Sequence, residues 1–87
     1  MQEIVIYTKN TCGYCHAAKD LLRRKSATFT EIVVDSDHAA QRAMSLRAQG
    51  RTSVPQIFIG SQHVGGCDDL HALERAGKLD PLLAGTA

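Results

Sequence analysis

The pattern of hydrophobic positions divides the chain into four short apolar runs and three longer amphipathic stretches. The apolar runs are too short for helices and are rich in Ile, Val and Phe, which is typical of buried strands. The amphipathic stretches repeat apolar residues at spacings typical of a helix with one buried face. Strands are therefore predicted at residues 3–7, 29–34, 54–59 and 62–64, helices at 13–25, 37–49 and 68–76, and a final turn or short helix around Pro81.

Turn and cap residues lie between these segments. Asp37 is an N-cap signal, Gly50 is expected at the C′ position of the second helix, and Gly77 closes the third helix. Gly60-Ser61 is a tight turn between the last two strands. A strand–helix–strand start predicts parallel pairing through a right-handed crossover, and the late hairpin adds an antiparallel edge. The sequence thus predicts an α/β fold in which helices on both faces flank one four-stranded mixed sheet.

The composition fits one small domain and limits the partners and the compartment that we expect for it. With 87 residues, 44% of them hydrophobic, a single core is feasible. A net charge of +1 gives no argument for nucleic acid or an anionic membrane surface, and no apolar run approaches the roughly 20 residues of a membrane span. The start of the chain does not resemble a signal peptide, and three cysteines argue against a fully paired secreted framework. We expect a cytoplasmic domain with no nucleic-acid or membrane partner, and a frayed tail at 85–87.

Two cysteines lie between the first predicted strand and the first predicted helix. Cys12 falls at or near the helix N-terminus, where unpaired N–H groups and the helix dipole favour an anion such as a thiolate. Cys15 lies one turn further on the same side, so the two sulfurs could close a disulfide with little backbone movement. Lys9 could add positive charge beside Cys12. The residues therefore predict an exposed, attacking thiol at Cys12 and a more buried, resolving thiol at Cys15.

The cysteine pair has two other interpretations. A zinc site needs four ligands, and beyond the pair the chain offers only Cys67 and four histidines, without a second C-x-x-C or an H-x₃₋₅-H motif. Inert structural cysteines are less expected, because Gly13 and Tyr14 suit a buried helical turn poorly. Redox chemistry is the favoured prediction.

The third predicted strand opens on Ser53, Val54 and Pro55. A proline can begin a strand, and the residues alone favour an ordinary trans bond. A cis bond would instead leave the N–H and C=O of Val54 free to pair with an extended peptide ligand. Both alternatives remain open from the residues themselves.

A glycine-rich motif at residues 65–69 leads into the third predicted helix. Its glycines permit close approach of a ligand to the backbone. Asp68 and Asp69 could cap the helix, or could help to bind the carboxylate and amine of an amino-acid terminus. Cys67 is interpreted as a small, half-buried residue.

The remaining candidates carry weaker signals. Tyr14, inside the cysteine motif, is interpreted as a lid or a contact surface. The four histidines, His16, His38, His63 and His71, are interpreted as solvated.

Four motifs in this order resemble the glutaredoxin family of the thioredoxin superfamily, in its small bacterial, dithiol form. They are Y-T-K at 7–9, C-G-Y-C at 12–15, S-V-P at 53–55 and G-G-C-D-D at 65–69, and the tract 50–59 also looks like the small bacterial type. The resemblance covers nearly the whole chain, and implies a thioredoxin fold with one glutaredoxin domain over residues 1–84.

The resemblance implies a glutathione-dependent thiol–disulfide oxidoreductase. Cys12 and Cys15 would be catalytic, and the enzyme would reduce protein–glutathione mixed disulfides and protein disulfides as a monomer without an obligatory cofactor. The Val54–Pro55 bond would be cis, Lys9 would lie near the glycine carboxylate, and Arg51 beside the groove could contribute. The residues expected to bind glutathione are Lys9, Tyr14, Thr52, Val54, Pro55, Gly66, Cys67 and Asp68.

Gly13 departs from the family pattern, which most often has proline at this position. Glycine leaves the helix start looser and supplies an additional N–H near the sulfurs. Some family members without that proline hold a [2Fe–2S] cluster between two subunits, using the first cysteine and glutathione. The departure therefore adds an alternative, a dimeric cluster scaffold or carrier with Cys12 as ligand.

Overall fold

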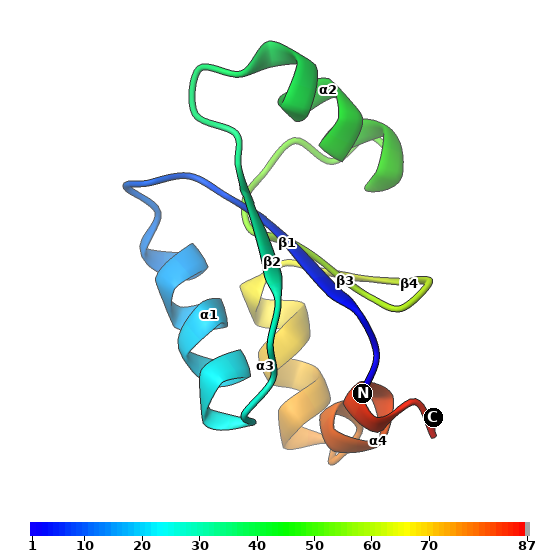
Figure 1. Cartoon of the computed structure of the whole chain (residues 1–87). Coiled ribbons are helices and arrows are strands. Elements are labelled where there is room, and N and C mark those ends of the chain that lie inside the picture. The colour runs from blue at the N-terminus through cyan, green and yellow to red at the C-terminus, as the bar shows by residue number, and fades with distance from the viewer. Residues whose placement is uncertain (87) are drawn as a thin grey trace.

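The structure is a computed structural model that describes residues 1–86, and its elements follow the predicted order (Figure 1). The helices and strands along the chain are β1 (Ile4–Thr8), α1 (Gly13–Arg24), β2 (Thr30–Val33), α2 (His38–Arg47), β3 (Gln56–Ile59), β4 (Gln62–Gly65), α3 (Cys67–Arg75) and α4 (Leu79–Ala84). The short helix predicted around Pro81 is α4. Among the described residues, none of the helices is both long and apolar enough to cross a membrane.

The four strands form one mixed sheet in the order β2-β1-β3-β4. β1 pairs with β2 in parallel, because α1 provides the crossover between them, and it pairs with β3 in antiparallel. The β3–β4 hairpin adds the antiparallel edge and contains one irregularity between Ile57 and Phe58. The predicted α/β fold with a four-stranded mixed sheet is confirmed.

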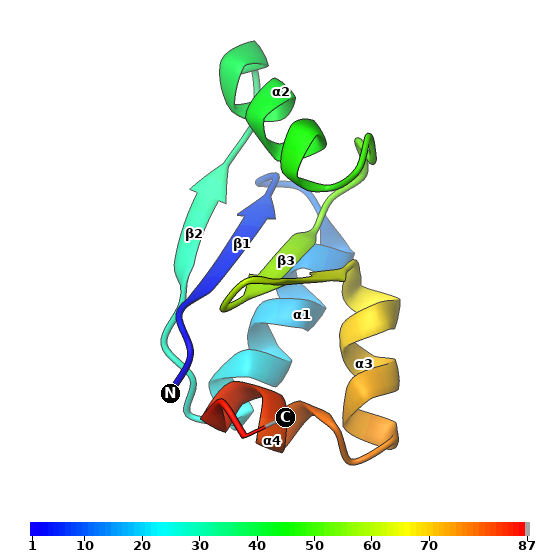
Figure 2. The same cartoon turned by 90° about the vertical axis from the view of Figure 1, so that its right-hand side faces the viewer.

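Alternating side chains of β1 enter two different cores. Ile4 and Ile6 pack on the face covered by α1, α3 and α4, whereas Val5 and Tyr7 pack on the face covered by α2. This is the two-residue periodicity of a strand that is buried on both sides. Figure 2 shows α2 on one side of the sheet and α1 and α3 on the other. The prediction of helices on both faces is therefore also confirmed.

Hydrogen bonds to the last helical carbonyls decide where each helix ends, and the sequence predicts these bonds only in part. Gly77 ends α3 as predicted, with φ of 71°, and Lys78 N donates to Leu73 O. The prediction for α2 is wrong by one residue: Gln49, with φ of 58°, occupies the left-handed position. Gly50 follows it, and its N–H donates to Ser45 O at 2.8 Å.

The N-terminal residues lie against α4, where the backbone N–H of Gln2 donates to Leu83 O at 2.8 Å (Figure 1). Gly85 and Thr86 each donate a backbone hydrogen bond to α4, at 3.1 and 2.9 Å. Residue 87, the last of the predicted frayed tail at 85–87, lies outside the described residues, and the tail remains a prediction.

Candidate active site

Cys12 is the N-cap of α1. Its backbone is extended, with φ of −101° and ψ of 109°, and its carbonyl accepts the N–H of His16 at 3.2 Å. Its sulfur accepts the backbone N–H of Cys15 at 3.1 Å, so the side chain satisfies one of the unpaired donors of the first turn. The predicted position of Cys12 at a helix N-terminus is confirmed, and its side chain is partly exposed.

The segment before β3 lies on the other side of this sulfur. The Val54–Pro55 peptide bond is cis, and the Cys12 thiol points to Val54 O with a sulfur–oxygen distance of 3.7 Å. The trans bond favoured by the residues alone is therefore wrong, and the cis bond implied by the family resemblance is confirmed. Two loops that are 42 residues apart in the chain meet at one sulfur atom.

Cys15 is completely buried, as predicted, and no disulfide joins the described cysteines, which are all free thiols. Burial raises the pKa of the Cys15 thiol to about 12, and the adjacent Cys12 side chain adds to the shift. One turn further along α1, the buried Lys19 pairs with Glu31 at 2.9 Å. Cys15 is thus a protonated, protected thiol beside a partly exposed one.

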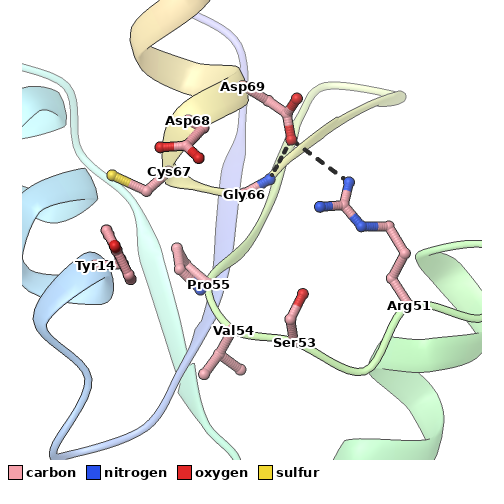
Figure 3. Close-up of a pocket in the computed structure, with 9 residues that line it drawn as sticks. All are labelled: Tyr14, Arg51, Ser53, Val54, Pro55, Gly66, Cys67, Asp68 and Asp69. Atoms are coloured by element: carbon pink, nitrogen blue, oxygen red, sulfur yellow. Dashed lines mark hydrogen bonds and ion pairs between the residues drawn. The ribbon is translucent and has the colours of Figure 1, made fainter.

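A pocket of about 320 Å³ is lined in part by Val54, whose carbonyl faces the Cys12 thiol, whereas Cys12 and Cys15 themselves do not line it (Figure 3). It lies where the start of α1, the loop before β3 and the start of α3 meet. Its lining residues are Tyr14, Arg51, Ser53, Val54, Pro55, Gly66, Cys67, Asp68 and Asp69. Tyr14 is 69% exposed and stands at the rim, which fits the predicted contact surface.

Six of the eight residues predicted to bind glutathione line this pocket, and two do not. Lys9 and Thr52 are exposed residues outside the lining. Lys9 belongs to a loop that Asp35 anchors, since the Asp35 carboxylate accepts the N–H of Asn10 at 2.6 Å. Two lining residues, Ser53 and Asp69, are absent from the predicted glutathione-binding set, although Ser53 stands inside the S-V-P motif and Asp69 inside the motif at 65–69.

The two adjacent aspartates have different surroundings. The Asp69 carboxylate accepts the N–H of Gly66 at 2.8 Å and pairs with the Arg51 guanidinium at 3.5 Å (Figure 3). Asp69 therefore caps α3 and holds Arg51 at the pocket. The Asp68 carboxylate has no ion-pair partner among residues 1–86, and lines the pocket. Of the two roles that the sequence left open, capping falls to Asp69, and both aspartates line the pocket.

Gly65 and Gly66 tolerate side chains very differently. Gly65 has φ of 113°, a Cβ there would collide with the Asp69 carboxylate, and it would lie 2.8 Å from Arg51 Nη1. A Cβ on Gly66 would meet Pro55 O at an ordinary 3.6 Å. At position 65 only glycine fits, because of the positive φ and the lack of space for a Cβ. At position 66 glycine keeps one side of the pocket open.

Cys67 is buried to 8% exposure, more deeply than predicted, and burial raises the pKa of its thiol. His71 Nδ1 lies 3.4 Å from the Cys67 sulfur and 2.9 Å from Cys67 O. Because a carbonyl oxygen only accepts, Nδ1 carries a proton toward it and is not a base for the thiol. The prediction of solvated histidines is wrong for His71 and for His63, which are half-buried and hydrogen-bonded, and correct for His16 and His38.

The described residues offer no ready-made metal site. No group of three or more His, Cys, Asp or Glu side chains that could hold a metal ion occurs within residues 1–86.

A thioredoxin-like α/β fold that places a C-x-x-C pair at a helix N-terminus, beside a cis-proline segment, defines a thiol–disulfide oxidoreductase. The glutaredoxin family model matches residues 4–64. A glutaredoxin from Pseudomonas aeruginosa is 58% identical over 97% of this chain and 99% of its own length, and glutaredoxin 3 from Escherichia coli K12 is 55% identical over 95% and 99%. The crystal structure of a buckwheat glutaredoxin–glutathione complex superposes with a TM-score of 0.88 at 35% identity, over 98% of this chain and 79% of that one. The chain belongs to the glutaredoxin family, whose members are glutathione-related thiol oxidoreductases.

Proposed function

We propose that this protein uses glutathione to reduce protein–glutathione mixed disulfides and protein disulfides through the Cys12 thiolate. The observation that carries the proposal is the position of the Cys12 sulfur. It lies 3.1 Å from the N–H of Cys15 and 3.7 Å from Val54 O, beside the pocket. An attacking sulfur thus stands between a donor that stabilises its anion and a backbone segment that can hold an extended peptide.

In the first half-reaction the Cys12 thiolate attacks the glutathionyl sulfur of a mixed disulfide. A bond forms between Cys12 and that sulfur, the protein–glutathione S–S bond breaks, and the protein thiolate leaves and takes up a proton. A second glutathione, as thiolate, then attacks the glutathionyl sulfur bound to Cys12. Oxidised glutathione leaves and the Cys12 thiolate is restored.

For protein disulfides, Cys15 resolves the mixed disulfide on Cys12 and forms the Cys12–Cys15 bond. Burial keeps Cys15 protonated before the first attack, so only one of the two sulfurs competes for substrate. Once Cys12 is in a disulfide, its negative charge and its hydrogen bond no longer raise the pKa of Cys15. The Cys15 thiol then ionises more readily, at the moment when its attack is needed.

The charges around the pocket suit a zwitterionic tripeptide. Arg51, paired with Asp69 at 3.5 Å, supplies a cation on one side. The Asp68 carboxylate, which has no ion-pair partner among residues 1–86, lines the pocket from the start of α3. The backbone of Val54 adds an N–H and a C=O to the same pocket. Three free thiols also suit a reducing compartment such as the cytoplasm, where we place the reaction.

The choice of electron donor tests this function. In an assay coupled to glutathione reductase, the protein should reduce a glutathionylated peptide at a rate that depends on glutathione concentration. With thioredoxin reductase and NADPH in place of glutathione, turnover should be poor. Efficient turnover with that reductase, and little with glutathione, would contradict the proposal and favour a thioredoxin-like donor.

A second candidate is the glutathione-ligated [2Fe–2S] scaffold, and the surroundings of Gly13 favour testing it. Apart from its two neighbours in the chain and the backbone of α1, a Cβ at Gly13 would meet no atom within 4 Å, so there is room for a side chain next to Cys12. Cys12 would supply this chain's ligand, with glutathione and a second subunit supplying the rest. Anaerobic purification with glutathione should give a brown dimer that Gly13→Pro converts to a colourless monomer; a colourless wild-type monomer after reconstitution rejects this candidate.

A further inference from the structure

A buried glutamine follows the cis proline and binds the backbone in front of it. Gln56 is 0% exposed, and its side chain makes three hydrogen bonds. Nε2 donates to Ser53 O at 3.0 Å and to Ser53 Oγ at 3.2 Å. Oε1 lies 2.8 Å from Nε2 of His63. A buried amide with these partners is held in one orientation, because any other would leave polar atoms unpaired.

The carbonyl of Ser53 sets the direction of the whole chain of bonds. A carbonyl oxygen only accepts, so the NH₂ group of Gln56 must face Ser53, and Oε1 must face His63. That oxygen also only accepts, so His63 carries a proton on Nε2. The donor that fixes Gln56 therefore comes from the edge strand β4.

His63 is in turn fixed by the hairpin. Phe58 and His63 are cross-strand partners in the β3–β4 register, and their rings stack with centroids 4.8 Å apart and planes 22° apart. Gln56 itself is the first residue of β3 and pairs with Tyr7 of β1. The rigid sheet thus holds the amide that holds the Ser53 backbone.

The Ser53–Val54 peptide is the part of this hydrogen-bond network that reaches the pocket. Ser53 and Val54 line it, as Figure 3 shows, and Val54 O faces the Cys12 thiol at 3.7 Å. Gln56 and His63 do not line the pocket. We propose that Gln56 and His63 are positioning residues that hold the Val54 backbone in the orientation in which it pairs with glutathione. This inference rests on the proposed function, since it takes glutathione as the occupant of the pocket.

Two substitutions test the proposal while keeping the packing. Gln56→Met keeps a side chain of similar length but removes all three hydrogen bonds, and His63→Phe keeps a ring on Phe58 but removes the Nε2 donor. Each should raise the KM for glutathione about three- to tenfold, the worth of one or two hydrogen bonds. The kcat and the rate of Cys12 alkylation by iodoacetamide should stay within about twofold, because neither residue touches the sulfur.

A matched control and a double variant complete the experiment. Gln41→Met also removes a glutamine hydrogen bond to backbone, the one from Nε2 to Val34 O at 2.9 Å, and should keep the wild-type KM. The Gln56→Met/His63→Phe double variant should raise the KM no further than Gln56→Met alone, because both changes act through one amide.

The outcomes separate the inference from the function on which it rests. A wild-type KM in both single variants, even with lower thermal stability, would overturn the positioning role. The hydrogen bonds of Gln56 would then have only a structural role. If Gln56→Met does not fold, His63→Phe decides, since its site is half-buried on an edge strand. A wild-type protein without glutathione-dependent turnover contradicts the proposed function, and this inference falls with it.

Discussion

The backbone N–H of Cys15 lies 3.1 Å from the sulfur of Cys12 and donates a hydrogen bond to it. One cysteine therefore stabilises the other through its backbone, while its own thiol remains buried and its pKa rises to about 12. The C-x-x-C spacing makes this possible, because the fourth residue of the motif places its N–H over the N-cap side chain. Two chemically identical side chains thereby differ in exposure and in hydrogen bonding.

The buried Cys15 thiol predicts a loss of stability at alkaline pH. Its pKa is near 9.0 when exposed and about 12 in the reduced, folded protein, so between these pH values unfolding releases a proton. Proton release on unfolding means that the free energy of unfolding falls as pH rises through this window, by at most about 1.4 kcal/mol per pH unit for one thiol. Urea unfolding of the reduced protein at pH 8, 9 and 10 measures this slope.

Cys15→Ala is the control for that slope. The variant should lose less stability than the wild type between pH 8 and 10, and Cys67, whose pKa burial also raises, cancels in the comparison. Equal slopes for the two proteins would show that the Cys15 thiol ionises as readily in the folded state as in the unfolded chain.

The surroundings of Gly65 and Gly66 predict that alanine at position 65 lowers stability, whereas alanine at position 66 weakens glutathione binding. Gly65→Ala should lower the free energy of unfolding by about 1–3 kcal/mol or more, because φ of 113° disfavours a side chain and the new Cβ collides with the Asp69 carboxylate. Gly66→Ala should change stability by less than about 1 kcal/mol, but raise the KM for glutathione, because its Cβ enters the pocket mouth near Pro55 O. Chemical denaturation and glutathione titration of both variants measure the two effects. Equal stability of the two alanine variants would contradict the backbone assignment.

The surroundings of Asp68 and Asp69 also predict different effects of alanine at the two positions, on glutathione binding at Asp68 and on stability at Asp69. Asp69→Ala should lower the free energy of unfolding by about 0.5–2 kcal/mol, because it removes the cap on Gly66 and the partner of Arg51. Asp68→Ala should leave the melting temperature near that of the wild type and raise the KM for glutathione about tenfold, the worth of one charge-assisted hydrogen bond. Thermal unfolding and steady-state kinetics on the two variants distinguish the roles; unchanged KM in Asp68→Ala would remove this residue from the binding site.

The sheet could be predicted from the sequence because strand periodicity is a local property. Ile4, Val5 and Ile6 alternate between two cores, and that alternation follows from side-chain geometry alone. The ends of elements were less predictable, since they depend on which backbone donor finds which acceptor. Gln49 takes the left-handed position directly after the helix, with φ of 58°, and Gly50 after it is also left-handed, with φ of 88°.

Contiguous motifs predicted most of the residues that line the site, but side-chain hydrogen bonds between distant residues were not predicted. Cys12 and Cys15 share one helical turn, so their different burial follows from their spacing. The pairing of Gln56 with His63 joins two strands across a hairpin, and nothing in the neighbourhood of either residue indicates it. For the same reason His63 was interpreted as solvated.

The most direct test of the proposed mechanism compares Cys12→Ser and Cys15→Ser on a small glutathione mixed disulfide, with glutathione and glutathione reductase supplying electrons. Cys12→Ser should be inactive, because the attacking sulfur is gone, whereas Cys15→Ser should keep turning over this substrate and lose only the reduction of protein disulfides. Residual activity of Cys12→Ser near the wild-type rate, or complete loss of activity in Cys15→Ser, would contradict the assignment of Cys12 as the attacking and Cys15 as the resolving thiol.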